Sequence, residues 1–189
     1  MHDVPNTPPH YGRGAMFGAA AAGLLAGLAA TMGRKAAVQS MTAVKGDWLD
    51  GLKTEHRAVL RIFDAIERTD NGDRLQRRTL LRKLKSALAH HAFQEENVVY
   101  PALRQHGDVE AADHLNHEHG YVKQKLFELS ELPSDQPQWS EKVRAFRGEL
   151  EAHMEDEESR LFPELHKALG EAGNKHLTYV MNLEGMKLA

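Results

Sequence analysis

The sequence predicts an all-α protein: an up-down-up-down antiparallel four-helix bundle over residues 47–169, with an Ala/Gly-rich helical segment ahead of it. Two observations predict the bundle. Apolar residues recur at alternating steps of three and four through four long stretches, which is the spacing of helices that bury one face. The breaks between these stretches are short and rich in Gly, Asp and Pro, and short connections make consecutive helices antiparallel neighbours.

The first 46 residues are expected to lie outside the bundle. Residues 1–13 are polar and Pro-rich, so we expect them to be disordered. Residues 14–33 are an uncharged stretch dominated by Ala and Gly. Arg34 and Lys35 close this stretch, and a linker continues to Gly46.

Each predicted helix has recognisable ends. Asp47 is a good N-cap for the first helix, and Asp70-Asn71-Gly72-Asp73 forms the turn after it. Gly107 ends the second helix, Pro137 suits the first turn of the fourth, and Gly170 stops the fourth. The expected helices cover residues 47–69, 74–105, 108–131 and 137–169.

Two further features follow from glycine and proline positions. Residues 170–189 are expected to form a C-terminal tail with a short helix over 174–184. Pro101 and Pro163 stand at matching places in the second and fourth helices, where each should bend its helix.

Charged residues occupy positions that the leucine spacing assigns to the buried seam. His91 and Glu95 stand four residues apart, as do His153 and Glu157. Each pair begins one of two similar segments, HAFQEENVVYP at 91–101 and HMEDEESRLFP at 153–163. A Glu-His pair precedes each phrase, so the chain is an internal duplication of one metal-ligand module. The inward-facing candidates are His56, His91, Glu95, His119, His153 and Glu157.

A metal site explains why a core would hold these groups. An unpaired carboxylate in an apolar interior costs several kcal/mol, and a neutral imidazole there needs partners for both nitrogens. A bound cation removes both penalties. Steps of four residues return to nearly the same helix face, so each His-Glu pair presents nitrogen and carboxylate to one point in the bundle.

The repeated motifs resemble those of the hemerythrin-like family, also called the HHE cation-binding domain. Glu-His, His-x-x-x-Glu-Glu and an aromatic-Pro pair occur twice in order over roughly residues 47–169. The resemblance implies two iron ions held between the helices. His56, His91, His119 and His153 would be terminal ligands, and Glu95 and Glu157 would bridge the irons.

Donor counting sharpens this interpretation. Imidazole with carboxylate suits iron or manganese, and two bridging carboxylates hold two cations close together. Two histidines and one oxygen from each glutamate give each metal four protein donors, and a bridging oxo or hydroxo group would add a fifth. One position on each iron would then stay open.

The chain departs from the oxygen-carrying hemerythrins at one place. Those proteins have a further histidine one turn before the third-helix ligand, whereas this chain has Leu115 there and Leu52 at the duplicate position. The pattern is closer to six-ligand relatives such as the iron-sulfur cluster repair di-iron proteins and the hemerythrin-type iron and oxygen sensors. Both leucines are expected to form dry walls beside the metals.

Three functions are compatible with this pattern. The first is reversible binding or sensing of O2 or NO by the di-iron pair. The second is an enzyme that consumes peroxide or NO at the same centre. The third is a metal-binding bundle with a structural or storage role, although two irons per chain make a poor store.

Neighbouring polar residues are expected to play smaller parts. Glu96 and Glu158 turn away from the ligand face, as solvated acids or as support for the ligands. Tyr100 and Tyr121 could donate hydrogen bonds near the centre. Tyr100 lies about two and a half turns past His91, however, and Tyr121 falls on a different face from His119, so we expect both at the amphipathic edges. His117 lies on another face from His119 and should not bind metal.

Composition limits the partners. The formal net charge of −3 gives no electrostatic case for nucleic acid, and the absence of cysteine excludes disulfides and thiolate metal sites. Residues 14–33 match the length of a membrane span but contain few strongly apolar side chains. A membrane anchor, a soluble helix that mediates homo-oligomerisation, and a signal or disordered segment are all compatible with them, in that order of preference. Arg34 and Lys35 favour a cytoplasmic bundle, attached to the inner membrane if the segment inserts.

Overall fold

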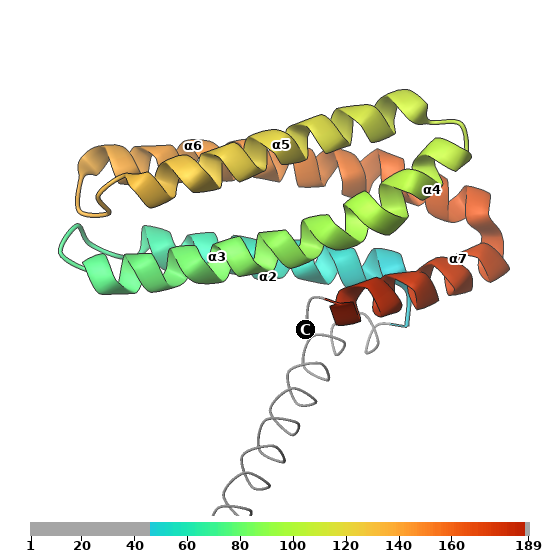
Figure 1. The fold of residues 1–189 in the computed structure, drawn as a ribbon, viewed down its shortest axis with the longest axis horizontal. Helices are drawn as coiled ribbons and strands as arrows, with labels where there is room; N and C mark the ends of the chain where they lie inside the picture. The colour runs from blue at the N-terminus through green and yellow to red at the C-terminus, as the bar shows by residue number, and fades with distance from the viewer. Residues whose placement is uncertain (1–45, 188–189) are drawn as a thin grey trace, which may run out of the picture.

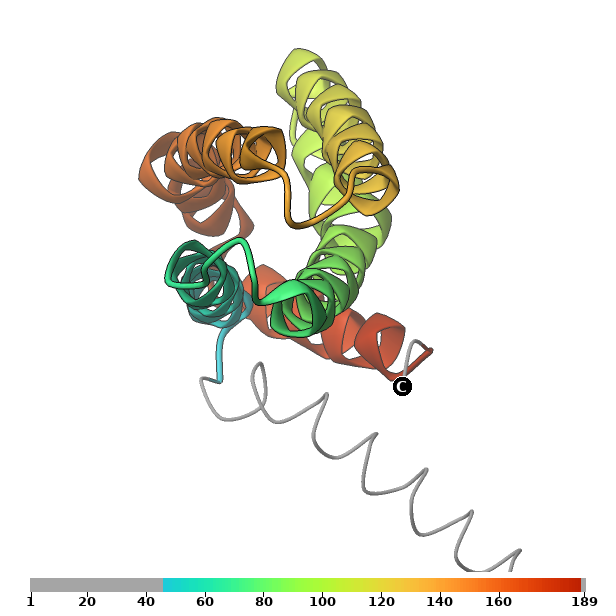
Figure 2. The same ribbon diagram turned by 90° about the vertical axis from the view of Figure 1, so that its left-hand side faces the viewer.

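The computed structural model describes residues 46–187 and confirms the all-α bundle. Helices α2 and α3 form one antiparallel pair, and α5 and α6 form the other (Figures 1 and 2). Contacts of α2 with α6 and of α3 with α5 close the bundle. The elements are α2 (Trp48–Glu67), α3 (Arg74–Gln94), η1 (Glu95–Val99), α4 (Tyr100–Gln105), α5 (Val109–Glu131), α6 (Pro137–Asp156), η2 (Glu157–Leu161) and α7 (Phe162–Lys187).

The helix ends follow the local signals in the sequence. The Asp47 carboxylate accepts a hydrogen bond from the Leu49 amide at 2.9 Å, which caps α2. Asp108 caps α5 in the same way through the Ala111 amide. Pro137 begins α6, where its missing amide proton is not needed. These three ends agree with the predicted boundaries.

The second and fourth predicted helices each contain one turn of π-helix, which apolar periodicity did not predict. These turns, η1 and η2, run from Glu95 to Val99 and from Glu157 to Leu161. Each ends one residue before the aromatic-Pro pair, whose proline has no amide proton and crowds an ordinary α-turn. The wider turn accommodates that proline, so the predicted bends take the form of π-turns.

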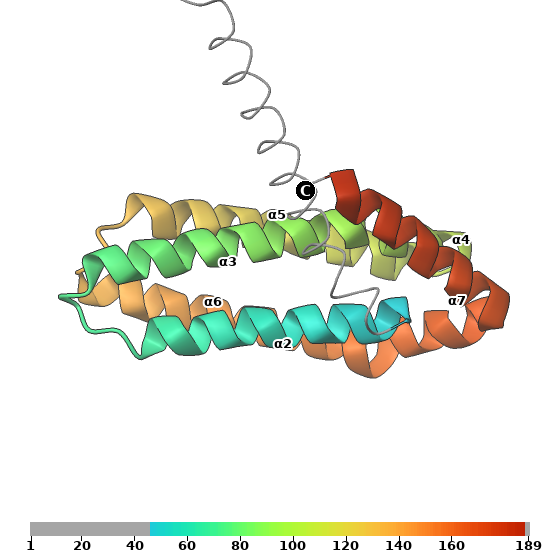
Figure 3. The same ribbon diagram turned by 90° about the horizontal axis from the view of Figure 1, so that it is seen from below.

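The C-terminal helix is longer than predicted and belongs to the core. Gly170 adopts φ 63° and ψ −175°, which breaks α7, and the chain then forms helix again through Lys187. This last segment lies across α2 and α3 (Figure 3). The Trp48 indole donates to Asn174 at 2.9 Å, and Leu177 and Met181 are buried. Residues 171–187 therefore cover one side of the bundle.

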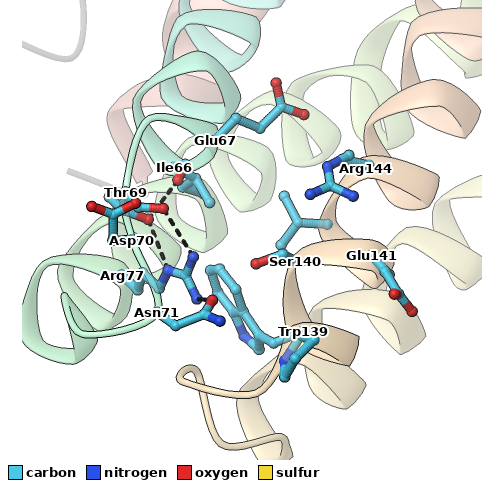
Figure 4. A pocket seen from close by; sticks show the side chains of 12 residues that line it. Ile66, Glu67, Thr69, Asp70, Asn71, Arg77, Trp139, Ser140, Glu141 and Arg144 are labelled. Atoms are coloured by element: carbon cyan, nitrogen blue, oxygen red, sulfur yellow. Dashed lines mark hydrogen bonds between the residues drawn. The ribbon is translucent and has the colours of Figure 1, made fainter.

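At the opposite end, one buried arginine ties the interhelical loops together (Figure 4). Arg77 donates to the Thr69 hydroxyl and carbonyl and to the Ser134 carbonyl, and its guanidinium stacks 5.1 Å from the Trp139 ring. A cavity of about 330 Å³ lies beside it. Because Arg77 is committed to these loop contacts, we assign it a structural role.

The apolar core has two parts with a polar layer between them. One cluster contains Phe63, Leu84 and Phe146, and the other contains Leu52 and Leu115. On α2, α3 and α5 the candidate histidine falls between residues of the two clusters in the chain, and on α6 His153 directly precedes Met154, the last residue of its cluster. The seam positions are buried as predicted, except Val122, which is only half-buried.

No helix within residues 46–187 is both long and apolar enough to cross a membrane. The predicted disorder of residues 1–13 and the predicted anchor or oligomerisation segment at 14–33 fall outside the described residues.

Candidate metal centre

The six candidate ligands meet in the polar layer of the bundle. Their donor atoms form two groups, and within each group all donor atoms lie within 4.8 Å of one another. Glu157 belongs to both groups. The six side chains are buried, and both glutamates are completely enclosed. The first group is His56, His91, Glu95 and Glu157, and the second is His119, His153 and Glu157.

Both glutamates contact histidines from the two halves of the duplication. Glu95 Oε2 lies 3.0 Å from His91 Nε2 and 3.4 Å from His119 Nε2. Glu157 lies 3.5 Å from His56 Nε2 through Oε2 and 3.4 Å from His153 Nε2 through Oε1. Each carboxylate is thus placed between two pairs of imidazoles, which is where a bridging ligand must lie.

Each histidine directs Nε2 at this centre because a glutamate holds its other nitrogen. In the first half, His56 Nδ1 lies 2.7 Å from Glu158 and His91 Nδ1 lies 3.1 Å from Glu55. A carboxylate accepts the Nδ1 proton, which fixes the ring orientation and leaves the Nε2 lone pair free for a metal.

The second half repeats the arrangement. His119 Nδ1 lies 3.1 Å from Glu96, and His153 Nδ1 lies 2.7 Å from Glu118. Glu96 and Glu158 therefore support histidines of the opposite half, whereas Glu55 and Glu118 support histidines of their own half. Glu55 and Glu118 belong to the Glu-His pairs that recur at matching positions in the sequence. That recurrence is a signal for both glutamates, but it did not predict that they hold the histidine rings.

In the metal-free centre, burial and neighbouring charges shift the pKa values of the ionisable side chains. Burial opposes ionisation of Glu95, but His91 outweighs it and lowers the pKa of this carboxyl to about 2. Burial and the neighbouring Glu95 charge raise the pKa of Glu157 well above its usual range. Burial lowers the pKa values of His56 and His153, so these imidazoles are held in the neutral form that binds metals.

Tyr100 also reaches the centre, so its predicted place at an amphipathic edge is wrong. Its hydroxyl donates to Glu157 Oε1 at 2.7 Å and lies 2.9 Å from His119 Nε2. An α-helix would turn Tyr100 about 140° away from Glu95. The π-turn instead bonds the Tyr100 amide to the Glu95 carbonyl and returns the side chain to the ligand face. Tyr121 is exposed, in agreement with its predicted place.

The donor set fits metal ions. His56 Nε2 and His91 Nε2 lie 2.9 Å apart, close to the ~3 Å expected between neighbouring ligands about 2.1 Å from one cation. Glu95 Oε1, Glu157 Oε2 and His153 Nε2 are buried without a hydrogen-bond partner. Unpaired buried acceptors are costly alone, and a bound cation would satisfy them.

Comparisons with known proteins agree with this geometry. Residues 48–165 match the model of the hemerythrin HHE cation-binding domain. This chain belongs to that family. A solved HHE cation-binding domain-containing protein from Mycobacterium kansasii shares its fold, with a TM-score of 0.64 and 23% identity over 75% of this chain and 86% of the other.

Two curated relatives match this HHE domain over part of their length. An uncharacterized hemerythrin-like protein of Schizosaccharomyces pombe is 27% identical over 131 residues, which is 68% of this chain and 64% of the yeast protein. A DNA nickase of Nostoc sp. is 23% identical over 120 residues, 64% of this chain and 34% of the nickase. The chain thus spans less than two thirds of either relative.

Proposed function

We propose that this HHE domain holds two iron ions and binds or senses O2 or NO. The observation that carries the proposal is the placement of Glu95 and Glu157, each in contact with histidines of both halves. Two irons would supply reversible binding of a diatomic ligand with redox change. His56 and His91 would hold one ion and His119 and His153 the other.

The surrounding residues suit reversible ligand binding. Leu52 and Leu115, one turn before His56 and His119, are fully buried and present no donor atom. With leucine where a further ligand could stand, bound metals would keep positions free for a small ligand beside an apolar, buried wall. This arrangement favours a small ligand over structural closure of the site.

A second candidate, consumption of peroxide or NO, is favoured by Tyr100. Its hydroxyl donates to Glu157 Oε1 and lies 2.9 Å from His119 Nε2, which places a protonated phenol beside the centre. A phenol that hydrogen-bonds Glu157 could donate that proton to a bound ligand. Catalysis would require this proton to be replaced after each turnover.

No nucleic-acid partner is proposed. The match to the nickase covers 34% of that protein, and the formal net charge of this chain is −3. Neither fact favours a phosphate backbone as ligand.

One experiment separates the candidates. The protein is loaded anaerobically with Fe2+, mixed with O2, NO or peroxide in a stopped-flow instrument, and followed by optical absorption. Binding or sensing predicts one ligand-dependent spectral change per centre that reverses when the gas is removed. Sustained consumption of peroxide or NO would assign the enzymatic function instead. Metal loading without any response to these molecules would leave a structural or storage role.

A further inference from the structure

A cavity of about 340 Å³ lies between α5 and α6, and the candidate ligand His153 is one of the residues that line it. Val122, Phe146 and Leu150 form its apolar walls. His153 is 6% exposed, and its Nε2 has no hydrogen-bond partner. The cavity is therefore lined by a candidate ligand whose Nε2 atom is buried and unpaired.

The side chains around this cavity differ from those at the matching positions of the α2/α3 half. Tyr121, Lys125 and Glu149 line it, and the matching positions between α2 and α3 hold Ala58, Ile62 and Ala87. Ile62 and Ala87 pack against the apolar core of the bundle. Larger polar residues replace these on the α5/α6 side, and long polar side chains turn outward rather than fill the seam.

The glutamates that hold the Nδ1 atoms of His91 and His153 also differ in exposure between the two halves. The Glu118 side chain that supports His153 is 35% exposed, whereas the Glu55 side chain that supports His91 is 5% exposed. Val122 is only half-buried, although its duplicate Val59 is 1% exposed. Solvent thus reaches much deeper on the α5/α6 side than on the α2/α3 side.

The lining favours an uncharged ligand. The exposed side chains of Lys125 and Glu149 form an ion pair 2.8 Å long, so they leave little net charge in the cavity, and Glu118 adds a carboxylate that disfavours anions. The apolar walls give an uncharged molecule no desolvation cost.

We propose that this cavity is the route by which a small uncharged molecule reaches the metal held by His119 and His153. The proposal rests on the proposed function for the metals themselves. It assigns ligand access to one side of a centre whose ligand set is nearly symmetric.

The route is tested first in the metal-free protein, with xenon as an uncharged probe. Methyl-labelled protein under xenon pressure should show shifts at Val122 and Leu150, because xenon binds beside apolar cavity walls such as these. Val122→Phe fills the cavity and should remove the shift at Leu150. Unshifted Val122 and Leu150 methyls in the wild-type protein would overturn the proposal.

The second test measures NO association with the iron-loaded protein. Val122→Phe should slow association about tenfold, and Ala58→Phe, which adds the same ring on the α2/α3 side, should change it less than about twofold. Lys125→Ala removes the rim ion pair and should speed association, which keeps the test valid if Val122→Phe does not fold. Unchanged rates in the folded cavity variants would overturn the route. Failure of the wild-type protein to take up NO would instead count against the proposed function, while the xenon result would still decide the cavity.

Discussion

The α2/α3 half and the α5/α6 half carry the same metal-binding groups but differ in what surrounds them. Both halves supply two histidines and a glutamate, and both support the histidines with outer carboxylates. They differ at the residue bonded through each π-turn, Tyr100 in one half and Phe162 in the other. The candidate metal ligands are thus nearly symmetric in this fold, whereas the Tyr100 hydroxyl and the proposed access cavity each belong to one half.

The largest expected effect tests the symmetric part. Glu95→Ala and Glu157→Ala should each lose both metals, because each carboxylate contacts histidines of both halves. Iron per chain after loading and desalting, measured by elemental analysis, should fall from about two to near zero. Exposed Glu155→Ala is the matched control. Retention of two irons in either glutamate variant would contradict the bridging arrangement.

The outer carboxylates sharpen the comparison. Glu55→Gln should weaken metal binding within the usual range of about 10–100-fold, because the side chain that orients His91 is buried. Glu118→Gln should have a smaller effect, since this partly exposed position lets water replace the lost contact. Competition with a chelator of known affinity gives both values. An equal loss in the two variants would show that burial does not distinguish the halves.

Tyr100→Phe makes the two halves alike at the π-turns. The variant removes the hydroxyl that donates to Glu157, so the metal-free protein should lose about 1–2 kcal/mol of unfolding free energy. Urea denaturation measures the change. Tyr121→Phe, at an exposed site, should stay within about 0.5 kcal/mol of wild type. No difference between the two variants would mean that the Tyr100 hydroxyl makes no stabilising contact.

The smallest expected effect concerns the helix register. His117 is exposed and contacts the Tyr121 ring, so His117→Ala should leave iron content and stability nearly unchanged. Iron analysis and thermal unfolding check this expectation. A large loss of iron would show that α5 is turned differently about its axis.

Periodicity predicted the parts of the molecule that repeat at helical spacing. The bundle, its loops and the inward direction of His56, His91, His119 and His153 follow from apolar residues at steps of three and four. This works because burial of one helix face constrains every position along it.

The parts that escaped prediction depend on departures from that spacing or on contacts between helices. The prediction for Tyr100 was wrong because an α-helix would direct a side chain five residues after Glu95 away from the ligand face. Only the π-turn returns the Tyr100 side chain to that face. The links from Glu96 to His119 and from Glu158 to His56 join different halves, and no local pattern encodes them. The packing of residues 171–187 depends on Trp48, which lies more than a hundred residues earlier in the chain.

Native mass spectrometry of the metal-free protein titrated with Fe2+ tests the central claim most directly. If Glu95 and Glu157 bridge two ions as proposed, binding of the first ion orients the ligands of the second, and the spectrum should pass to a species with two ions per chain. A folded protein that takes up no metal, or stops at a single ion under excess iron, would contradict the shared two-metal centre.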